Sequence, residues 1–216
     1  MAKCKIKGIF FFLLSVAALI SPAYATTIEL YPGESIQSAI DEAVSGDTVF
    51  LFSGTYAENI AMKDGVRVEG EAYNQVELYG NVLFKDTSAT LKDITVVFPQ
   101  GNFTSYTNTY YTDWQLSQDA GITAINSSPT IQNCVIKPDL DNILPESERY
   151  GNGIQIWNMY ENSDISPQIE GNLIQNTECG IYYFSQAFGG AINGKIKNNT
   201  LYNNEYGVIL RMHKEN

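Results

Sequence analysis

The C-terminal part of the sequence repeats with a period of 27 residues. The segments Ile169–Ile174 and Ile196–Leu201 align at this offset, and so do the Gly-starting segments Gly153–Trp157, Gly180–Phe184 and Gly207–Arg211. Each unit holds short runs of alternating apolar residues, which indicate strands, and its turns carry Asn and Gly. A unit this short cannot bury its own apolar side chains, so it must stack on the next unit in a solenoid.

The stacked repeat predicts an all-β fold, a right-handed parallel β-helix in which equivalent residues of successive coils form columns. No helical pattern separates the repeated strands, which excludes a βαβ layer. Asn172 and Asn199 are expected to form a short internal ladder of side-chain amides at one turn. Upstream, Leu91–Val96, Gly121–Ile125 and Ile131–Ile136 fit the same patterns at longer spacings.

The N-terminal part predicts a cap for the β-helix. Ser35 can cap a helix over Ile36–Val44, which Gly46 would end, and its apolar stripe would cover the open end of the stack. Strands are expected at Thr26–Leu30, Thr48–Phe52, Val66–Glu69, Val76–Tyr79 and Val82–Phe84.

This entry region also carries a family resemblance. The segments Ser35–Ile40, Ser45–Val49, Gly54–Asn59 and Gly65–Gly70 resemble the entry segment of exported right-handed β-helix proteins of the pectin-lyase-like superfamily. With the later coils, the resemblance covers nearly all of the chain after residue 25. It implies the fold, whereas the superfamily ranges from polysaccharide lyases, glycoside hydrolases and pectin esterases to non-catalytic surface or periplasmic proteins. The paired-Asp and Gly-His-Gly signatures of polygalacturonases are absent from the sequence.

Residues 1–25 have the pattern of a secretory signal peptide. Lys3, Lys5 and Lys7 precede the apolar run Ile9–Ile20, and Ala23-Tyr24-Ala25 offers the small residues that a signal peptidase reads. We therefore expect cleavage after Ala25 and export to the periplasm, the cell surface or the medium, with residues 26–216 as one domain. No later segment is apolar enough to span a membrane.

Charge and chain end set further expectations. Cleavage removes three lysines and no acid from 13 basic and 24 acidic residues, which leaves a net charge of −14. So acidic a chain is not expected to bind nucleic acid. Gly207–Arg211 begins another coil, yet no capping element precedes Asn216. Either the chain is a truncated product of a longer β-helix, or a protein partner covers the open C-terminal end.

The insertions indicate where a site would lie. Val96 to Gly121 and Ile136 to Gly153 are much longer than the corresponding links in later coils, so loops would wall one sheet. Alternation places Gln155, Trp157, Tyr182, Phe184 and Arg211 on the outer face of that sheet, with Trp157, Tyr182 and Phe184 as an exposed aromatic strip. The first insertion adds Tyr110, Tyr111 and Trp114. Aromatic faces beside amides and hydroxyls suit a sugar ring, so we expect these residues to bind polysaccharide or a cell-surface glycan.

Two other functions stay open. The first is a polysaccharide lyase or glycoside hydrolase, for which the loops offer many carboxylates but single out none. The second is a structural surface or assembly module without a ligand. We predict no metal site and no cofactor, with Ca²⁺ bound by Asp139 and Asp141 together with Glu146 or Glu148 as a weaker alternative; His213 is the only histidine. Cys134 and Cys179 are expected at different corners, buried and unbridged.

Overall fold

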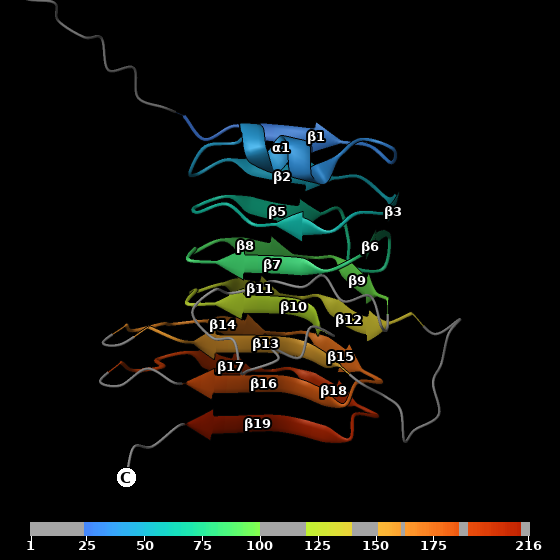
Figure 1. Ribbon diagram of the computed structural model, residues 1–216. Coiled ribbons are helices and arrows are strands. Elements are labelled where there is room, and N and C mark those ends of the chain that lie inside the picture. The colour runs from blue at the N-terminus through green and yellow to red at the C-terminus, as the bar shows by residue number, and fades with distance from the viewer. Residues whose placement is uncertain (1–23, 100–119, 140–150, 161–162, 186–189, 213–216) are drawn as a thin grey trace, which may run out of the picture.

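The computed structural model describes residues 24–99, 120–139, 151–160, 163–185 and 190–212. Its strands stack into a parallel β-helix with three sheets, which we call A, B and C (Figure 1). Sheet A contains β1 (Thr27–Leu30), β2 (Thr48–Leu51), β5 (Arg67–Gly70), β8 (Thr90–Lys92), β11 (Thr130–Gln132), β14 (Gln168–Glu170) and β17 (Lys195–Lys197). Sheet B contains β3 (Gly54–Tyr56), β6 (Val76–Tyr79), β9 (Thr95–Phe98), β12 (Val135–Pro138), β15 (Leu173–Gln175) and β18 (Thr200–Tyr202). Sheet C contains β4 (Ile60–Ala61), β7 (Val82–Lys85), β10 (Ala120–Ile125), β13 (Asn152–Asn158), β16 (Cys179–Ser185) and β19 (Tyr206–Met212).

The register of the parallel strands confirms the predicted repeat. Ile154 pairs with Ile181, and Ile181 pairs with Val208 in the next coil. A Cβ atom built on Gly153 would lie 2.8 Å from the carbonyl oxygen of Gly180, so these glycines stand directly over each other. Residues 27 apart therefore share a wall of the solenoid, as the sequence predicts.

Stacked apolar side chains fill the interior of the coils. Val49, Val68, Leu91, Ile131 and Ile169 occupy one inward column of sheet A and are all fully buried. Such a column works because successive coils lie about 4.8 Å apart, which is the sheet spacing and brings branched side chains into contact.

The one helix of the described residues, α1 (Ile36–Glu42), closes the N-terminal end of the stack (Figure 1). Ser35 caps it, because its hydroxyl accepts the backbone N–H of Ser38 at 3.1 Å, and Ile36 and Ile40 are buried. The helix ends two residues earlier than predicted. Ala43 is already extended, and Val44, predicted to lie on the apolar stripe, is exposed.

The predicted amide ladder is confirmed. Asn172 donates from Nδ2 to Oδ1 of Asn199 at 2.9 Å, and the backbone N–H of Asn172 donates to the same oxygen at 2.9 Å. Cys134 and Cys179 are free and buried, as predicted. Burial is the main cause that raises the pKa of Cys134 to about 12 and that of Cys179 to about 11. No helix of the described residues has the length and apolar character needed to cross a membrane.

Candidate ligand-binding face

The outer face of sheet C carries the predicted site residues that the structure describes. Register brings them into two columns, each with one residue per coil. The first column is Thr123, Gln155, Tyr182 and Ile209. The second column is Lys85, Ile125, Trp157, Phe184 and Arg211. The sequence therefore predicts correctly which side chains share this face; Tyr110, Tyr111 and Trp114 lie outside the described residues.

The aromatic side chains of this face form a cluster of their own, separate from the coil interior. The rings of Trp157 and Phe184 lie 4.8 Å apart, and Met159 completes the buried cluster. Tyr182 packs against it, with its ring centroid 5.9 Å from that of Trp157.

The prediction of an exposed aromatic strip is wrong. Trp157 and Phe184 are each only 6% exposed, and Tyr182 is half-buried. These rings pack against each other and against Met159, so an outward position does not by itself give exposure. Among the predicted site residues described here, solvent reaches part of Tyr182 and the exposed Arg211, whose guanidinium carbon lies 6.0 Å from the Tyr182 ring centroid.

Gln155 points outward but is buried, at 1% exposure. Its Nε2 donates to Oγ1 of Thr123 at 2.8 Å, and its Oε1 accepts from Nδ2 of Asn152 at 3.1 Å. Both ends of the amide are therefore engaged across two coils. These hydrogen bonds hold neighbouring strands of sheet C in register, so Gln155 has a structural role on this face.

Two buried polar atoms at the edge of the cluster lack a hydrogen-bond partner among the described residues. They are the indole Nε1 of Trp157, a donor, and the Oδ1 of Asn158, an acceptor. The amide nitrogen of Asn158 donates to the carbonyl oxygen of Ser163 at 2.8 Å, which orients the amide. Buried polar atoms in folded proteins are nearly always paired, so this donor and this acceptor are unusual.

The charge of this face differs from that of the whole chain. The six described strands of sheet C contain no Asp or Glu, and their two charged residues are Lys85 and Arg211. The strands of sheet A, by contrast, mix three acidic residues, Glu29, Glu69 and Glu170, with four basic ones. A chain with 24 acidic residues and 13 basic ones thus presents a locally basic face.

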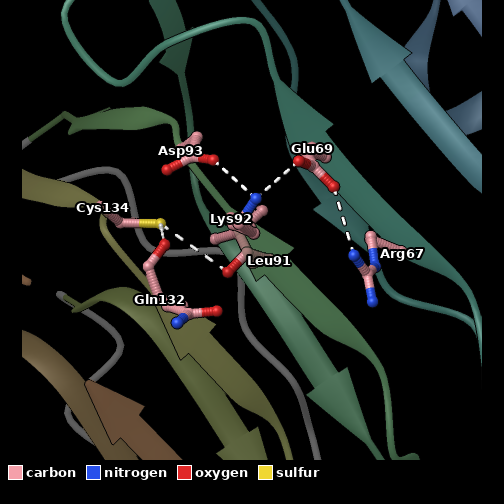
Figure 2. A network of polar contacts seen from close by, with 7 residues as sticks. All are labelled: Arg67, Glu69, Leu91, Lys92, Asp93, Gln132 and Cys134. Atoms are coloured by element: carbon pink, nitrogen blue, oxygen red, sulfur yellow. Dashed lines mark hydrogen bonds and ion pairs between the residues drawn. The ribbon is translucent and has the colours of Figure 1, made fainter. Parts of the chain in front are cut away.

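Charged side chains also meet on sheet A, but there they neutralise one another (Figure 2). Lys92 Nζ lies 2.6 Å from Glu69 and 2.9 Å from Asp93, and Arg67 lies 3.3 Å from Glu69. The hydrogen bonds to Glu69 and then to Asp93 raise the pKa of Lys92. The same column repeats the pairing, with Lys197 3.0 Å from Glu170. We infer that this network of ion pairs stabilises the stacking of successive coils.

A groove of about 290 Å³ lies over the turns that lead from sheet A to sheet B. Its lining includes Tyr73, Asp93, Asn133, Gly171 and Thr200. The sequence did not indicate it, because Tyr73 belongs to the corresponding turn of an earlier coil, between β5 and β6, which the predicted repeat did not include.

Acidic groups do not gather into a metal site in the part of the chain that the structure describes. No group of three or more His, Cys, Asp or Glu side chains there could hold an ion. Of the alternative Ca²⁺ ligands, Asp139 is described, whereas Asp141, Glu146 and Glu148 lie outside the described residues.

The last described coil exposes apolar side chains. Val208 is 43% exposed and Leu210 is 70% exposed, whereas their equivalents one coil earlier, Ile181 and Tyr183, are buried.

None of the curated proteins matches the chain. Residues 24–216 match the model of a family described as "Protein of unknown function (DUF1565)", and because this match spans most of the sequence, the chain belongs to that family.

Proposed function

We propose that the protein is an exported right-handed β-helix, related to the pectin-lyase-like proteins, that binds carbohydrate on the outer face of sheet C. One observation carries the proposal: beside the aromatic cluster of that face, the half-buried Tyr182 ring is open to solvent, and the exposed Arg211 guanidinium carbon lies 6.0 Å from its centroid. A sugar has an apolar ring face that can pack on an aromatic ring, and it has hydroxyl groups that accept and donate hydrogen bonds.

Tyr182 and Arg211 are the residues proposed to touch the ligand first. The half-buried Tyr182 ring offers its free part to the apolar face of a sugar, and the exposed Arg211 guanidinium offers several N–H donors to its oxygens. The Trp157 ring packs against both Tyr182 and Phe184, and because Trp157 and Phe184 are buried, they are not themselves stacking surfaces. Lys85 and Arg211 also favour acidic over cationic sugars, since no carboxylate lies on the strands of sheet C described here.

Binding to defined oligosaccharides tests the proposal. A panel of neutral and acidic glycans is titrated with the protein and with the Tyr182→Ala and Arg211→Ala variants. We expect each variant to bind about tenfold more weakly, which corresponds to about 1.4 kcal/mol. Tyr202→Ala is the matched control, because Tyr202 is an exposed tyrosine of sheet B at 62% exposure, and this variant should bind like the wild type.

Three outcomes would be informative. A panel without binding, or equal affinities for all four proteins, would contradict the proposal. Release of new reducing ends or unsaturated products from a bound glycan would show that the face belongs to a glycoside hydrolase or polysaccharide lyase. In that case the same variants would lower turnover.

The exposed apolar side chains of the last coil favour a second proposed function, pairing with a strand-bearing partner. Val208 and Leu210 stand where the next coil of a solenoid would pack. If this coil associates, Leu210→Lys should shift the protein to a smaller sedimentation coefficient. A wild-type protein that sediments as a monomer at all concentrations and binds no partner chain would argue against it.

A further inference from the structure

Asp47 is a buried carboxylate at the N-terminal end of the solenoid. It lies in the turn between α1 and β2 and is only 4% exposed. Its Oδ2 accepts the backbone N–H of Val44 at 2.8 Å. Its Oδ1 accepts the backbone N–H of Thr26 at 2.7 Å and the hydroxyl of Thr26 at 2.9 Å. The carboxylate thus ties the end of α1 to the residue that leads into β1.

Thr26 is held on both sides. Its carbonyl oxygen accepts the backbone N–H of Thr48 at 2.8 Å, and its N–H and hydroxyl go to Asp47. Thr26 is itself exposed, like Ala25 and Tyr24, the latter at 80%, but its hydrogen bonds to Asp47 and Thr48 anchor it. The Ala25–Thr26 peptide bond therefore joins an exposed segment to the first anchored residue, and it is the bond at which the sequence predicts signal-peptide cleavage.

We propose that cleavage of the Ala25–Thr26 bond creates an α-ammonium group on Thr26 that forms an ion pair with the buried Asp47 carboxylate, so that export processing completes the N-terminal end of the solenoid. The endopeptidase hydrolyses the peptide bond with one water molecule. As the C–N bond breaks, the carbonyl carbon of Ala25 takes the water oxygen and becomes a carboxylate, and the Thr26 nitrogen takes the two water protons and becomes an ammonium group. This inference rests on the predicted cleavage site and is independent of the proposed carbohydrate binding.

The new charge changes the strength of an existing contact. Before cleavage Thr26 offers Asp47 one amide N–H, whereas afterwards its nitrogen carries a positive charge and three N–H donors. Charge-assisted hydrogen bonds are about twice as strong as neutral ones. A buried carboxylate with a directly bonded cation is also better compensated than one bonded to neutral amides alone.

Asp47 is prepared for such a partner. The hydrogen bond from the Val44 N–H, followed by that from the Thr26 N–H, lowers the pKa of Asp47, so it is ionised at neutral pH. Lys63 is the charged group that faces it from the segment after β4, and Lys63 Nζ donates to the carbonyl oxygens of Asp41 and Ala43. Arg67, whose backbone N–H bonds the Asp47 carbonyl, pairs its guanidinium with Glu69.

The test compares a protein that begins at Thr26 with one that retains Ala23–Ala25, each with and without Asp47→Asn. The ordinary pKa of an α-amino group is about 7.7–8.0, and pairing with Asp47 raises it. The contribution of the pair is therefore fully present below pH about 7.7 and is lost as the pH rises through the raised pKa. We expect the Thr26 form to melt several degrees higher than the extended form at pH about 6–7, with a difference that disappears near pH about 10.

Asp47→Asn should abolish the difference between the two forms. Equal melting temperatures at every pH, or a difference that survives Asp47→Asn, would overturn the proposal. Should that variant fail to fold, NMR titration of the Thr26 α-amino group in the wild-type protein gives a second readout. A pKa above 8 is expected there, and an ordinary pKa would overturn the proposal, as would an exported protein whose N-terminal residue by mass spectrometry is not Thr26.

Discussion

Removing the Asn172 side chain should destabilise the protein far more than its size suggests. Asn172 is only 1% exposed and forms the centre of the internal ladder. Its Oδ1 accepts the backbone N–H of Cys134 at 2.9 Å, and its Nδ2 donates to the carbonyl oxygen of Ile131 and to Oδ1 of Asn199, each at 2.9 Å. Asn172→Ala loses all three bonds at once and leaves the Cys134 N–H buried without an acceptor.

The magnitude follows from these contacts. A buried hydrogen bond contributes about 1 kcal/mol net, and a buried donor left unpaired costs about 1–3 kcal/mol. We therefore expect Asn172→Ala to lower the free energy of unfolding by about 3–5 kcal/mol. Asn199→Ala should cost less, about 1–2 kcal/mol, because Asn199 is half-buried and water can replace its amide.

Urea unfolding followed by far-UV circular dichroism measures both values, with the exposed Thr200→Ala as a control that should change stability by less than about 0.5 kcal/mol. Asn172→Asp adds a pH test. Its carboxylate would face two acceptors, whereas the protonated acid can donate to one, so its pKa is raised and the variant is most stable at acidic pH. A loss of less than about 1 kcal/mol in Asn172→Ala would refute the ladder as a source of stability.

Three further predictions follow from single contacts. Gly153→Ala should cost about 2 kcal/mol or more, since its Cβ would lie 2.2 Å from a methyl group of Ile174, whereas Gly207→Ala meets only an ordinary 3.5 Å contact and should change urea-measured stability by less than about 1 kcal/mol. Lys92→Met should lower the free energy of unfolding by about 1 kcal/mol at neutral pH. Because pairing raises the pKa of Lys92, this loss of stability should shrink above pH about 10.4. A loss that stays constant with pH would mean that packing causes it. Burial, which raises the pKa of the Cys134 thiol to about 12, should keep it unreactive toward disulfide reagents at pH about 8 until urea unfolds the protein, so rapid labelling of the native state would contradict its placement.

The sequence predicts the columns of this fold because a solenoid converts spacing along the chain into position in space. Counting 27 residues from Gly153 reaches Gly180 and then Gly207, and the structure stacks them. The same counting does not reach elements that break the period. Strands β3 and β4 have three and two residues, which is too short for an alternating pattern to stand out.

The end of α1 was mispredicted for a reason that lies outside the helix. Periodicity alone carries the apolar stripe on to Val44. The backbone N–H of Val44 instead donates to Oδ2 of Asp47, and Ala43 is extended. A side chain three residues ahead thus takes Val44 out of the helix, and periodicity carries no information about that competition.

Alternation likewise gives the side of a strand and not its exposure. Trp157 and Phe184 lie on the outer face of sheet C, as predicted, yet they pack in a cluster with their ring centroids 4.8 Å apart and are each only 6% exposed. Gln155 is in the same position, since its amide bonds with Thr123 and Asn152 rather than with solvent. Exposure depends on the volumes and polar groups of neighbouring coils, which a pattern within one strand does not record.

Cys134 shows how such a column can be extended by design. It stands directly above Asn172 in the ladder column, with Ile94 as the next residue up. Its sulfur already receives the backbone N–H of Ile94 and lies 3.8 Å from the carbonyl oxygen of Leu91. The Ile94 N–H and the Leu91 carbonyl are the equivalents, one coil earlier, of the two backbone groups that Asn172 bonds, namely the Cys134 N–H and the Ile131 carbonyl. An amide at position 134 would meet both and could also donate to Oδ1 of Asn172.

Cys134→Asn should therefore raise the free energy of unfolding by about 1 kcal/mol, since hydrogen bonds of ordinary strength replace those of a weakly bonding thiol. Cys134→Ala should lower it by a similar amount, because it leaves a small cavity and the Ile94 N–H without its sulfur acceptor. Urea unfolding of the two variants decides the matter. Because an amide is larger than a thiol, a Cys134→Asn variant less stable than Cys134→Ala would mean that the coil is too tightly packed at this level for the ladder to grow.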